Sequence, residues 1–198
     1  DASPLAYNRA ALYSGKALDF DGVNDSVEVA DNSSLDFTTA MSAFCYARID
    51  STSGSGHLFS KYDYGINQRS WTIQQEGANL RVIISLNGFS GGANTKDYIF
   101  STFENTSDYY FVGYTFESNV LKLYVNGQEV TATKTNDAEI TSIFSGSAKV
   151  ALGAIQNSGA AASFFNGKIA NARAFNTALT AAQIADLYNN PEKIVPTG

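Results

Sequence analysis

The chain has 198 residues, is 44% hydrophobic and 13% aromatic, and carries a formal net charge of -6. This composition suits one all-β sandwich with a sizeable core. The acidic balance and the lack of a Lys/Arg cluster argue against nucleic acid as a partner, because phosphate would be repelled. No stretch is long and apolar enough for membrane insertion. The polar start at Asp1, without a signal peptide, suggests a processed protein or an excised domain.

The pattern of strands begins after an N-terminal stretch in which Ser3-Pro4 could open a short helical turn or a docked loop. Residues 16–30 alternate apolar and polar side chains on both sides of a turn at 21–25, which predicts a hairpin. Segments 62–70 and 87–96 are expected to be loops, and 131–141 is polar, with Ile140 and Ile143 bracketing a turn. Further strands are expected at residues 37–49, 57–61, 71–75, 80–86, 98–103, 109–116, 121–130, 149–155 and 164–175.

The segment LKLYVNGQEV, residues 121–130, alternates Leu and Val with other side chains, as a half-buried strand does. Its Asn126-Gly127 pair tolerates positive φ at both central positions of a tight hairpin turn. The preceding segment, 109–116, is aromatic on both faces. This predicts a central strand with one face in the core and the other lining a concave surface.

The hydrophobic period changes near the C-terminus. Thr180 and Gln183 have the spacing of a capping box, in which each side chain bonds the other residue's backbone N–H. Ile184, Leu187 and Tyr188 then form one apolar face of a short helix. More than ten short strands and one terminal helix indicate a single all-β domain over residues 1–198 with two stacked antiparallel sheets.

Three segments also carry a family resemblance: ALDFDGVNDSVEV, DYYFVGYTFESNVLKLYVNGQEV and FFNGKIANARAFNTALTAAQIADLYNN. In this order and spacing they resemble laminin-G-like jelly rolls of the concanavalin A-like lectin/glucanase superfamily, over a core of about residues 16–190. The resemblance implies two antiparallel sheets of about six or seven strands each. It also implies rim loops that often bind carbohydrate, sometimes with calcium. Ala170 departs from the family, whose members often carry an acidic residue there.

The turn at residues 21–25 offers hard oxygen ligands from Asp21, Asn24 and Asp25, beside a glycine that lets carbonyl groups approach. Calcium takes six to eight such oxygens. The alternative is that Asp and Asn favour this turn by bonding their own backbone. Without a cluster of His or Cys, zinc has no support.

Carbohydrate recognition needs aromatic faces and planar amide, carboxylate or guanidinium groups. The segment 62–71 and the glycine-rich loop 87–96 supply both. The candidate carbohydrate-binding residues are Tyr62, Asp63, Tyr64, Asn67, Gln68, Arg69, Trp71 and Phe89. Trp71 alternates with Ile73 and therefore fits the core equally well, and Phe89 could instead fold back over the end of the sandwich.

Catalysis is disfavoured. The paired strand carboxylates of related glucanases, spaced Glu-x-Asp-x-x-Glu, do not occur in this chain. His57, the only histidine, is expected at a strand edge rather than as a base, and Cys45, the only cysteine, as a small buried thiol.

The sequence therefore predicts a non-catalytic recognition module that binds glycan or a glycosylated surface through rim loops around residues 62–71 and 87–96. An extracellular, cell-surface or virion-surface setting, in an adhesin, secreted enzyme or phage tail protein, fits such a module. The alternative is a structural module that assembles with other domains or subunits and has no small ligand. A jelly-roll enzyme that degrades glycans ranks third.

Overall fold

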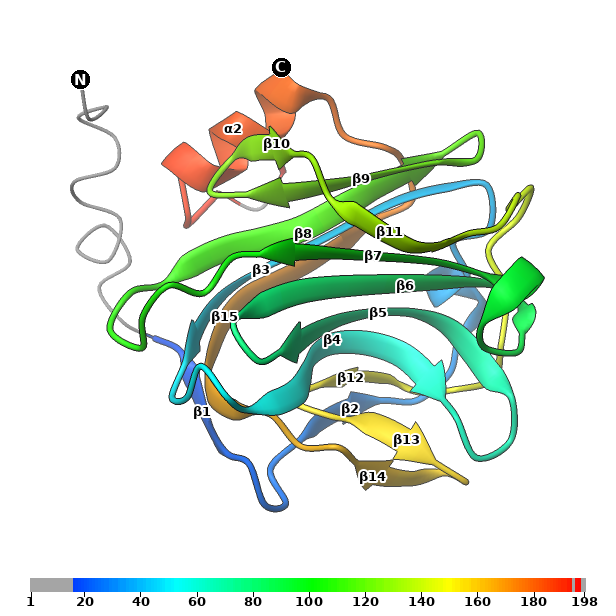
Figure 1. Ribbon diagram of the computed structural model, residues 1–198, viewed down its shortest axis with the longest axis horizontal. Coiled ribbons are helices and arrows are strands. Elements are labelled where there is room, and N and C mark those ends of the chain that lie inside the picture. Colours follow the sequence, from blue (N-terminus) through cyan, green and yellow to red (C-terminus); the bar gives the residue numbers. More distant parts are fainter. Residues whose placement is uncertain (1–15, 194, 197–198) are drawn as a thin grey trace.

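The computed structural model describes residues 16–193, 195 and 196, so the expectation for Ser3-Pro4 lies outside the described residues. The chain forms two stacked β-sheets and a short helix, α2 (Ala181–Asn189) (Figure 1). The predicted all-β jelly-roll sandwich with one C-terminal helix is confirmed. The sheets hold six and nine strands, where the resemblance implied six or seven each.

The six-stranded sheet has the order β1-β15-β3-β8-β9-β10. Its strands are β1 (Leu18–Asp21), β3 (Ala40–Ile49), β8 (Tyr110–Glu117), β9 (Val120–Val125), β10 (Gln128–Val130) and β15 (Asn166–Phe175). Asn126 and Gly127 have φ values of 50° and 79°, and they close the hairpin between β9 and β10 as predicted.

The nine-stranded sheet has the order β11-β7-β6-β5-β4-β12-β2, with β13 beside β4 and β14 beside β13. Its strands are β2 (Val27–Val29), β4 (Ser55–Asp63), β5 (Gln68–Glu76), β6 (Asn79–Gly88), β7 (Thr95–Ser101), β11 (Thr133–Asp137), β12 (Val150–Leu152), β13 (Ile155–Asn157) and β14 (Ala160–Ala162). Short 3-10 turns, η1 (Ser33–Leu35) and η2 (Gly92–Asn94), lie in two of the loops.

The core lies between the sheets and takes every second side chain of the central strands. Ile73 and Val82 enter it from the nine-stranded sheet, and Tyr114 and Leu123 enter it from the six-stranded sheet. Cys45 is fully buried there, and burial raises the pKa of its thiol to about 12. The prediction of a buried structural cysteine is confirmed.

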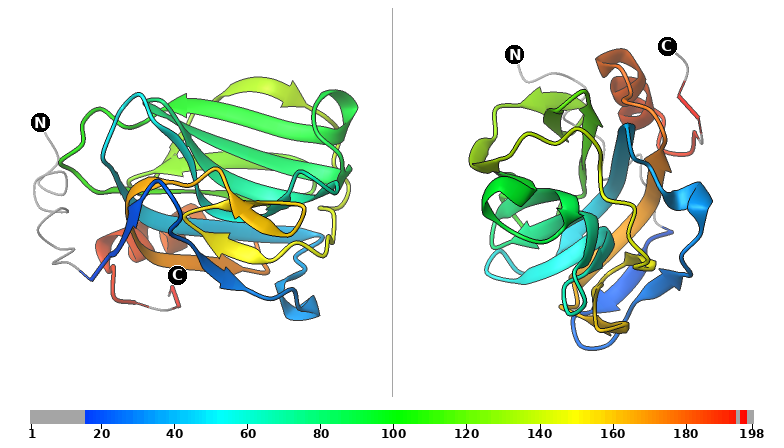
Figure 2. Two further views of the ribbon diagram at one scale, coloured as in Figure 1. Left: turned by 90° about the horizontal axis from the view of Figure 1, so that it is seen from below. Right: turned by 90° about the vertical axis from the view of Figure 1, so that its right-hand side faces the viewer.

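A second apolar cluster covers the outer face of the six-stranded sheet, where α2 packs (Figure 2). Ile184 and Leu187 of the helix meet Phe44, Tyr46 and Phe111 of the sheet, and all five are buried. The predicted capping box of Thr180 and Gln183 starts this helix. The second aromatic face of residues 109–116 therefore lies under α2, and the prediction that it lines a concave surface was wrong. Ala170 lies in the same cluster.

The predicted hairpin over residues 16–30 was also wrong. β1 pairs with β15 in one sheet, and β2 pairs with β12 in the other. Alternation marks two strands, but it does not say which partner each strand takes. The polar segment 131–141, for which the sequence predicted no strand, contains β11, which pairs with β7.

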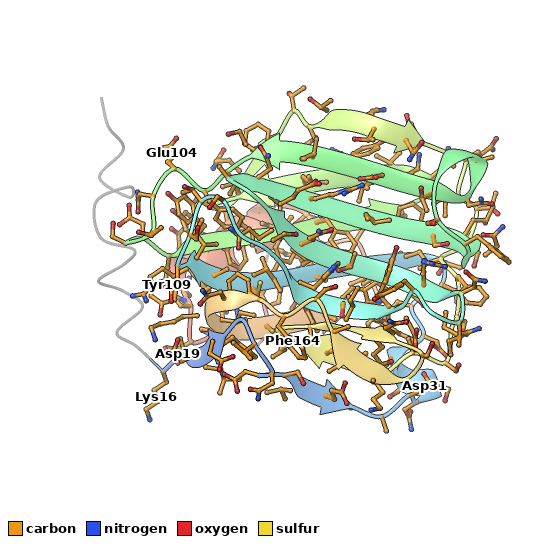
Figure 3. The ribbon with its side chains drawn as sticks, turned by 60° about the horizontal axis from the view of Figure 1, so that its bottom comes forward. Lys16, Asp19, Asp31, Glu104, Tyr109 and Phe164 are labelled. Carbon is orange, nitrogen blue, oxygen red and sulfur yellow. The ribbon has the colours of Figure 1, made fainter. Side chains whose placement is uncertain are left out.

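The loops that connect the strands lie at two opposite ends, or rims, of the sandwich. Asp31 lies at one end, and Glu104 and Tyr109 lie at the other (Figure 3). The predicted loop 62–70 is shorter than expected, because β4 continues through Asp63 and β5 begins at Gln68.

Candidate ligand-binding groove

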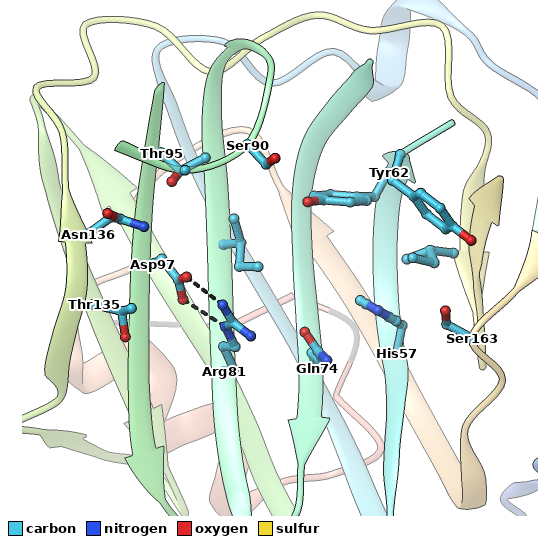
Figure 4. Close-up of a pocket in the computed structure, with 14 residues that line it drawn as sticks. His57, Tyr62, Gln74, Arg81, Ser90, Thr95, Asp97, Thr135, Asn136 and Ser163 are labelled. Carbon is cyan, nitrogen blue, oxygen red and sulfur yellow. Dashed lines mark hydrogen bonds and ion pairs between the residues drawn. The ribbon is translucent and has the colours of Figure 1, made fainter. Parts of the chain in front are cut away.

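A polar groove of about 460 Å³ crosses the outer face of the nine-stranded sheet, on the side away from the core (Figure 4). Side chains alternate along each strand, and outward positions of β5, β6 and β7 face this groove, namely Gln74, Arg81, Ile83, Thr95 and Asp97. The groove is lined by His57, Tyr62, Tyr64, Gln74, Arg81, Ile83, Ser90, Gly91, Thr95, Asp97, Thr135, Asn136, Ile155 and Ser163.

Sheet register brings the central groove residues together. His57 lies opposite Gln74, and Gln74 lies opposite Arg81, so three neighbouring strands contribute one row. In the next row, Ile83 lies opposite Asp97, which lies opposite Asn136. The row of polar side chains is therefore fixed by backbone pairing rather than by flexible loops.

An Arg81–Asp97 ion pair occupies the middle of the groove (Figure 4). Arg81 Nε donates to Asp97 Oδ1 at 2.8 Å, and Nη2 donates to Oδ2 at 2.6 Å. Nη1 donates to the Glu76 carboxylate at 3.2 and 3.3 Å. The hydrogen bonds to Asp97 are the largest cause of a raised pKa for Arg81. Such a two-pronged pair holds both side chains in one geometry.

His57 lies in the same row as Arg81, on the far side of Gln74, and is buried (Figure 4). Its Nδ1 is 2.8 Å from the hydroxyl of Thr72. Burial, with a smaller contribution from the charge of Arg81, lowers the pKa of His57 to about 3. The imidazole is therefore neutral at ordinary pH. His57 was expected at the head of its strand, but β4 begins earlier, at Ser55, and His57 lies inside it opposite Gln74 of β5.

Tyr62 and Tyr64 form the aromatic end of the groove. The Tyr62 ring stacks on His57 with a centroid distance of 6.3 Å, and burial raises the pKa of its hydroxyl. Arg69 lies 5.8 Å from the same ring and donates to the carbonyl oxygens of Tyr64 and Gly88 at 2.7 and 3.0 Å. Of the eight residues predicted to bind carbohydrate, these two tyrosines line the groove.

Two predicted contact residues have structural partners instead. Asp63 is 1% exposed, and its carboxylate accepts the backbone N–H groups of Gly65, Ser158 and Gly159 at 3.0, 2.8 and 2.7 Å. Gln68 Oε1 accepts the N–H of Ser147 at 2.9 Å. These bonds tie loops together at the rim.

Trp71 lies in the core, and the interpretation of this residue as an exposed sugar platform was wrong. It is 1% exposed and meets Phe59 edge-on, with ring centroids 4.9 Å apart. It occupies an inward position of β5, in the same alternation as Ile73.

The two predicted rim loops lie side by side. Asn67 has φ 56° in the turn between β4 and β5, and its Oδ1 accepts a hydrogen bond from Arg69. A Cβ at Gly88, whose φ is +86°, would lie 2.2 Å from the backbone oxygen of Asn67. Only glycine permits this approach. Phe89 follows with a 51% exposed side chain, so it does not fold back over the sandwich end.

The turn at residues 21–25 is held by its own side chains. Asp21 Oδ1 accepts the N–H groups of Val23 and Asn24 at 2.8 and 3.3 Å, and Asp25 Oδ2 accepts the N–H of Asp21 at 3.0 Å. Across the described residues, no group of three or more His, Cys, Asp or Glu side chains gathers that could hold a metal ion. Calcium at this turn stays a prediction.

The sequence analysis missed the central residues of the groove, namely Gln74, Arg81, Asp97 and Asn136. Alternation in WTIQQ and LRVII does place Gln74 and Arg81 opposite the apolar positions. A single sequence does not reveal that β6 pairs with β7, which brings Arg81 and Asp97 together.

A laminin-G-type family model, described as concanavalin A-like lectin/glucanases superfamily, matches residues 21–185. The chain belongs to the concanavalin A-like lectin/glucanase superfamily. No curated protein matches the sequence of this chain. Within the described ranges, no helix has the length and apolar character of a membrane span.

Several solved structures share this concanavalin A-like fold at low sequence identity. The CBM40 domain of the Ruminococcus gnavus IT-sialidase, bound to alpha2,3 sialyllactose, has a TM-score of 0.68 and 14% identity, covering 88% of this chain and 97% of that chain. A heptameric SAP-like pentraxin from Limulus polyphemus has a TM-score of 0.61 and 13% identity, covering 86% and 80%.

The ligand binding domain of botulinum neurotoxin serotype D, in complex with N-acetylneuraminic acid, has a TM-score of 0.62 and 18% identity. The match covers 87% of this chain but 41% of the toxin chain, so the present chain spans less than half of that structure. At these identities the likeness shows the fold.

Proposed function

We propose that this chain is a non-catalytic glycan-binding module whose ligand lies in the groove of the nine-stranded sheet. The observation that carries this proposal is the composition of the groove. The exposed Tyr64 lies at one end beside the buried Tyr62, and amide, hydroxyl and paired charged groups from neighbouring strands cover the rest. Aromatic faces suit the C–H surfaces of a sugar ring, and fixed polar groups suit its hydroxyls.

The structural relatives support a lectin-like role. The CBM40 structure holds sialyllactose, and the toxin structure holds N-acetylneuraminic acid. Both are binding domains on the same type of sandwich. The proposal moves the contact surface from the rim loops to the sheet, and Tyr64 and Ser90 are loop residues that also line the groove.

The groove chemistry supports binding over catalysis. Glycosidases of the common type need two carboxylates on either side of one glycosidic bond. Asp97 is the single carboxylate in the described lining, and it already accepts two hydrogen bonds from Arg81. His57, with its pKa lowered to about 3, is not a proton donor near neutral pH.

An exposed setting outside the cell or on a virion suits a module that recognises glycans, and we extend the proposal to such a setting. Calcium at Asp21, Asn24 and Asp25 is a separate part of the proposal. These residues lie in the turn between β1 and β2, so a cation there would act on the loop rather than in the groove.

The test is a glycan-array screen of the domain with calcium and with a chelator. Gln74→Ala removes a half-buried amide from the middle of the groove, and Gln128→Ala makes the same change at an exposed position of β10. We expect glycan signals that Gln74→Ala weakens and Gln128→Ala leaves intact. Silence of the wild-type domain in both conditions would overturn the proposal. Signals lost only with the chelator would support the calcium part.

An assembly module is the second candidate, and one observation favours it. β2 lies at the edge of the nine-stranded sheet, and its Val27 and Val29 side chains are exposed. An unprotected apolar edge strand can pair with another chain. Sedimentation over a range of protein concentrations tests this candidate: a species that stays monomeric contradicts it, and an oligomer dispersed by Val29→Lys supports it.

A further inference from the structure

We infer that the groove selects uncharged saccharides and discriminates against sugars that carry a carboxylate. This inference rests on the proposed function and names the class of ligand for the same site. It concerns the electrostatics of the groove, because a ligand carboxylate needs an available cation or several free N–H donors when it leaves water.

The cation inside the groove is already neutralised. Arg81 and Asp97 are the charged residues in the described lining, and they bond to each other. All three guanidinium nitrogens of Arg81 donate to carboxylates, two to Asp97 and the third to Glu76. Arg81 thus has two negative neighbours for one positive charge. A ligand carboxylate at this point would meet excess negative charge.

No other Arg or Lys side chain lies in the described lining of the groove. Arg69 is bonded to the carbonyl oxygens of Tyr64 and Gly88 and to the side chain of Asn67. Lys96 and Lys134 both bond Asp137. Both ammonium groups lie over the ring of Tyr98, a core-facing residue of β7, and so lie on the face opposite the groove.

His57 adds no positive charge either. Its burial and, to a smaller extent, the charge of Arg81 on the far side of Gln74 lower its pKa, and its Nδ1 is bonded to Thr72. The aromatic neighbour Tyr62 carries no charge near neutral pH. The groove therefore keeps the same electrostatic character across the ordinary pH range.

The remaining lining suits hydroxyl groups. A sugar hydroxyl both donates and accepts hydrogen bonds, and the groove offers both kinds of partner in fixed positions. The Asp97 carboxylate is an acceptor, and the amides of Gln74 and Asn136 offer one acceptor and two donor hydrogens each. Thr95 and Thr135 add hydroxyls nearby. Tyr64, at the open end, can stack on a ring without regard to charge.

The ligand class inferred for this chain differs from the ligands bound by its structural relatives. N-acetylneuraminic acid and sialyllactose both carry a carboxylate, and they are bound by domains that share only 14–18% identity with this chain. The shared sandwich does not fix the charges on its outer face. The ligand class depends on the charged side chains of Arg81, Asp97 and Glu76 in this chain.

The experiment compares matched glycans that differ only in an acidic residue, such as lactose with alpha2,3 sialyllactose and other neutral and sialylated or uronic-acid pairs, on one array. For every neutral glycan bound, we expect its acidic counterpart to bind at least about tenfold more weakly, because uncompensated charge is disfavoured in a partly buried groove. A wild-type preference for acidic glycans that groove variants abolish would overturn the inference and leave the proposed function standing. Silence towards neutral and acidic glycans alike would overturn both.

Two variants sharpen the comparison. Asp97→Asn removes the closer negative neighbour of Arg81. Gln74→Lys adds a cation on the neighbouring strand, opposite Arg81, and leaves both residues of the Arg81–Asp97 pair in place. We expect each to shift the neutral-to-acidic ratio at least about tenfold towards acidic glycans. Gln128→Lys makes the same charge change on β10 and should leave the ratio unchanged.

Circular dichroism separates these effects from misfolding. If Asp97→Asn does not fold, the ratio measured for Gln74→Lys tests the inference. This variant is expected to fold, since the Gln74 side chain is half-buried at the groove surface. An unchanged ratio in folded Gln74→Lys, or an equal shift in Gln128→Lys, would contradict the inference.

Discussion

The two outer faces of this sandwich have opposite chemistry. On the six-stranded sheet, Phe44, Tyr46 and Phe111 face outward and are covered by α2. On the nine-stranded sheet, the outward positions hold Gln74 and Arg81, and α2, the α-helix of the described residues, lies on the other sheet. An exposed sheet face of aromatic residues would be an aggregation site, whereas a polar face can remain open to solvent. The difference indicates which face stabilises the fold and which is free to bind.

The two faces also differ in what fixes their side chains. Under α2, aromatic rings pack against each other, with Phe44 and Phe111 stacked at a centroid distance of 5.1 Å. In the groove, hydrogen bonds and ion pairs hold the side chains, as between Arg81 and Asp97. Substitutions on the helix face should therefore change the free energy of unfolding, and substitutions at the mouth of the groove should change binding.

The largest effect on stability is expected from Leu187→Ala in α2. Leu187 is fully buried against the six-stranded sheet, and a Leu-to-Ala change in such a site costs about 2–5 kcal/mol of the free energy of unfolding. Urea unfolding measures this loss. Ala182→Gln, at an exposed position of the same helix, should change stability by less than about 0.5 kcal/mol. Equal losses in the two variants would contradict the account of the covered face.

The next effect is a pH dependence that originates in the groove. The unfolded chain protonates His57 as the pH falls below the ordinary value of 6.5, and the folded chain resists protonation down to about 3. The unfolded state then binds more protons, so stability is constant above pH 6.5 and falls as the pH drops from 6.5 towards 3. From pH 7 to pH 5 the loss from this group is about 2 kcal/mol.

His57→Gln removes this titration while keeping a hydrogen-bonding partner for Thr72. Urea unfolding of both proteins at pH 7 and pH 5 should show a smaller decline for the variant than for the wild type. Parallel declines would mean that His57 titrates normally in the folded protein. Glycan affinity of the folded wild type should stay flat over the same range, because the imidazole remains neutral.

The smallest effect on stability is expected from Tyr64→Ala, at the mouth of the groove. Tyr64 is 38% exposed, so the change in unfolding free energy should stay within about 0.5 kcal/mol. Affinity for an array-positive glycan should fall roughly three- to tenfold, as expected for an aromatic contact of about 0.5–1.5 kcal/mol. Titration calorimetry measures the affinity. Val120→Ala, exposed on the other sheet, is the control and should leave it unchanged.

Local signals predicted the local structure well. Asn126-Gly127 closes its hairpin, and Thr180 with Gln183 caps α2, because each device depends on residues within a few positions of one another. The hairpin expected at residues 16–30 failed for the converse reason. The partners of β1 and β2 lie more than 100 residues away in the sequence, and alternation contains no information about them.

The candidate site shows the same limit. Tyr62 and Tyr64 were found because a cluster of aromatic and amide residues stands out along the chain. Arg81 and Asp97 were missed because they lie 16 residues apart in the sequence and meet only when β6 and β7 pair. Trp71 was ambiguous because alternation along its strand does not say which face is buried. In the structure Trp71 points into the core, where it packs against Phe59.

The most direct test of the central claim is the position of a bound glycan, mapped by amide chemical-shift changes in NMR when an array-positive oligosaccharide is titrated into the labelled domain. The account predicts shifts concentrated on β4, β5, β6 and β7 around His57, Gln74, Arg81 and Asp97, with no change near α2. Shifts confined to the Asp21–Asp25 turn or to the helix-covered face would contradict it.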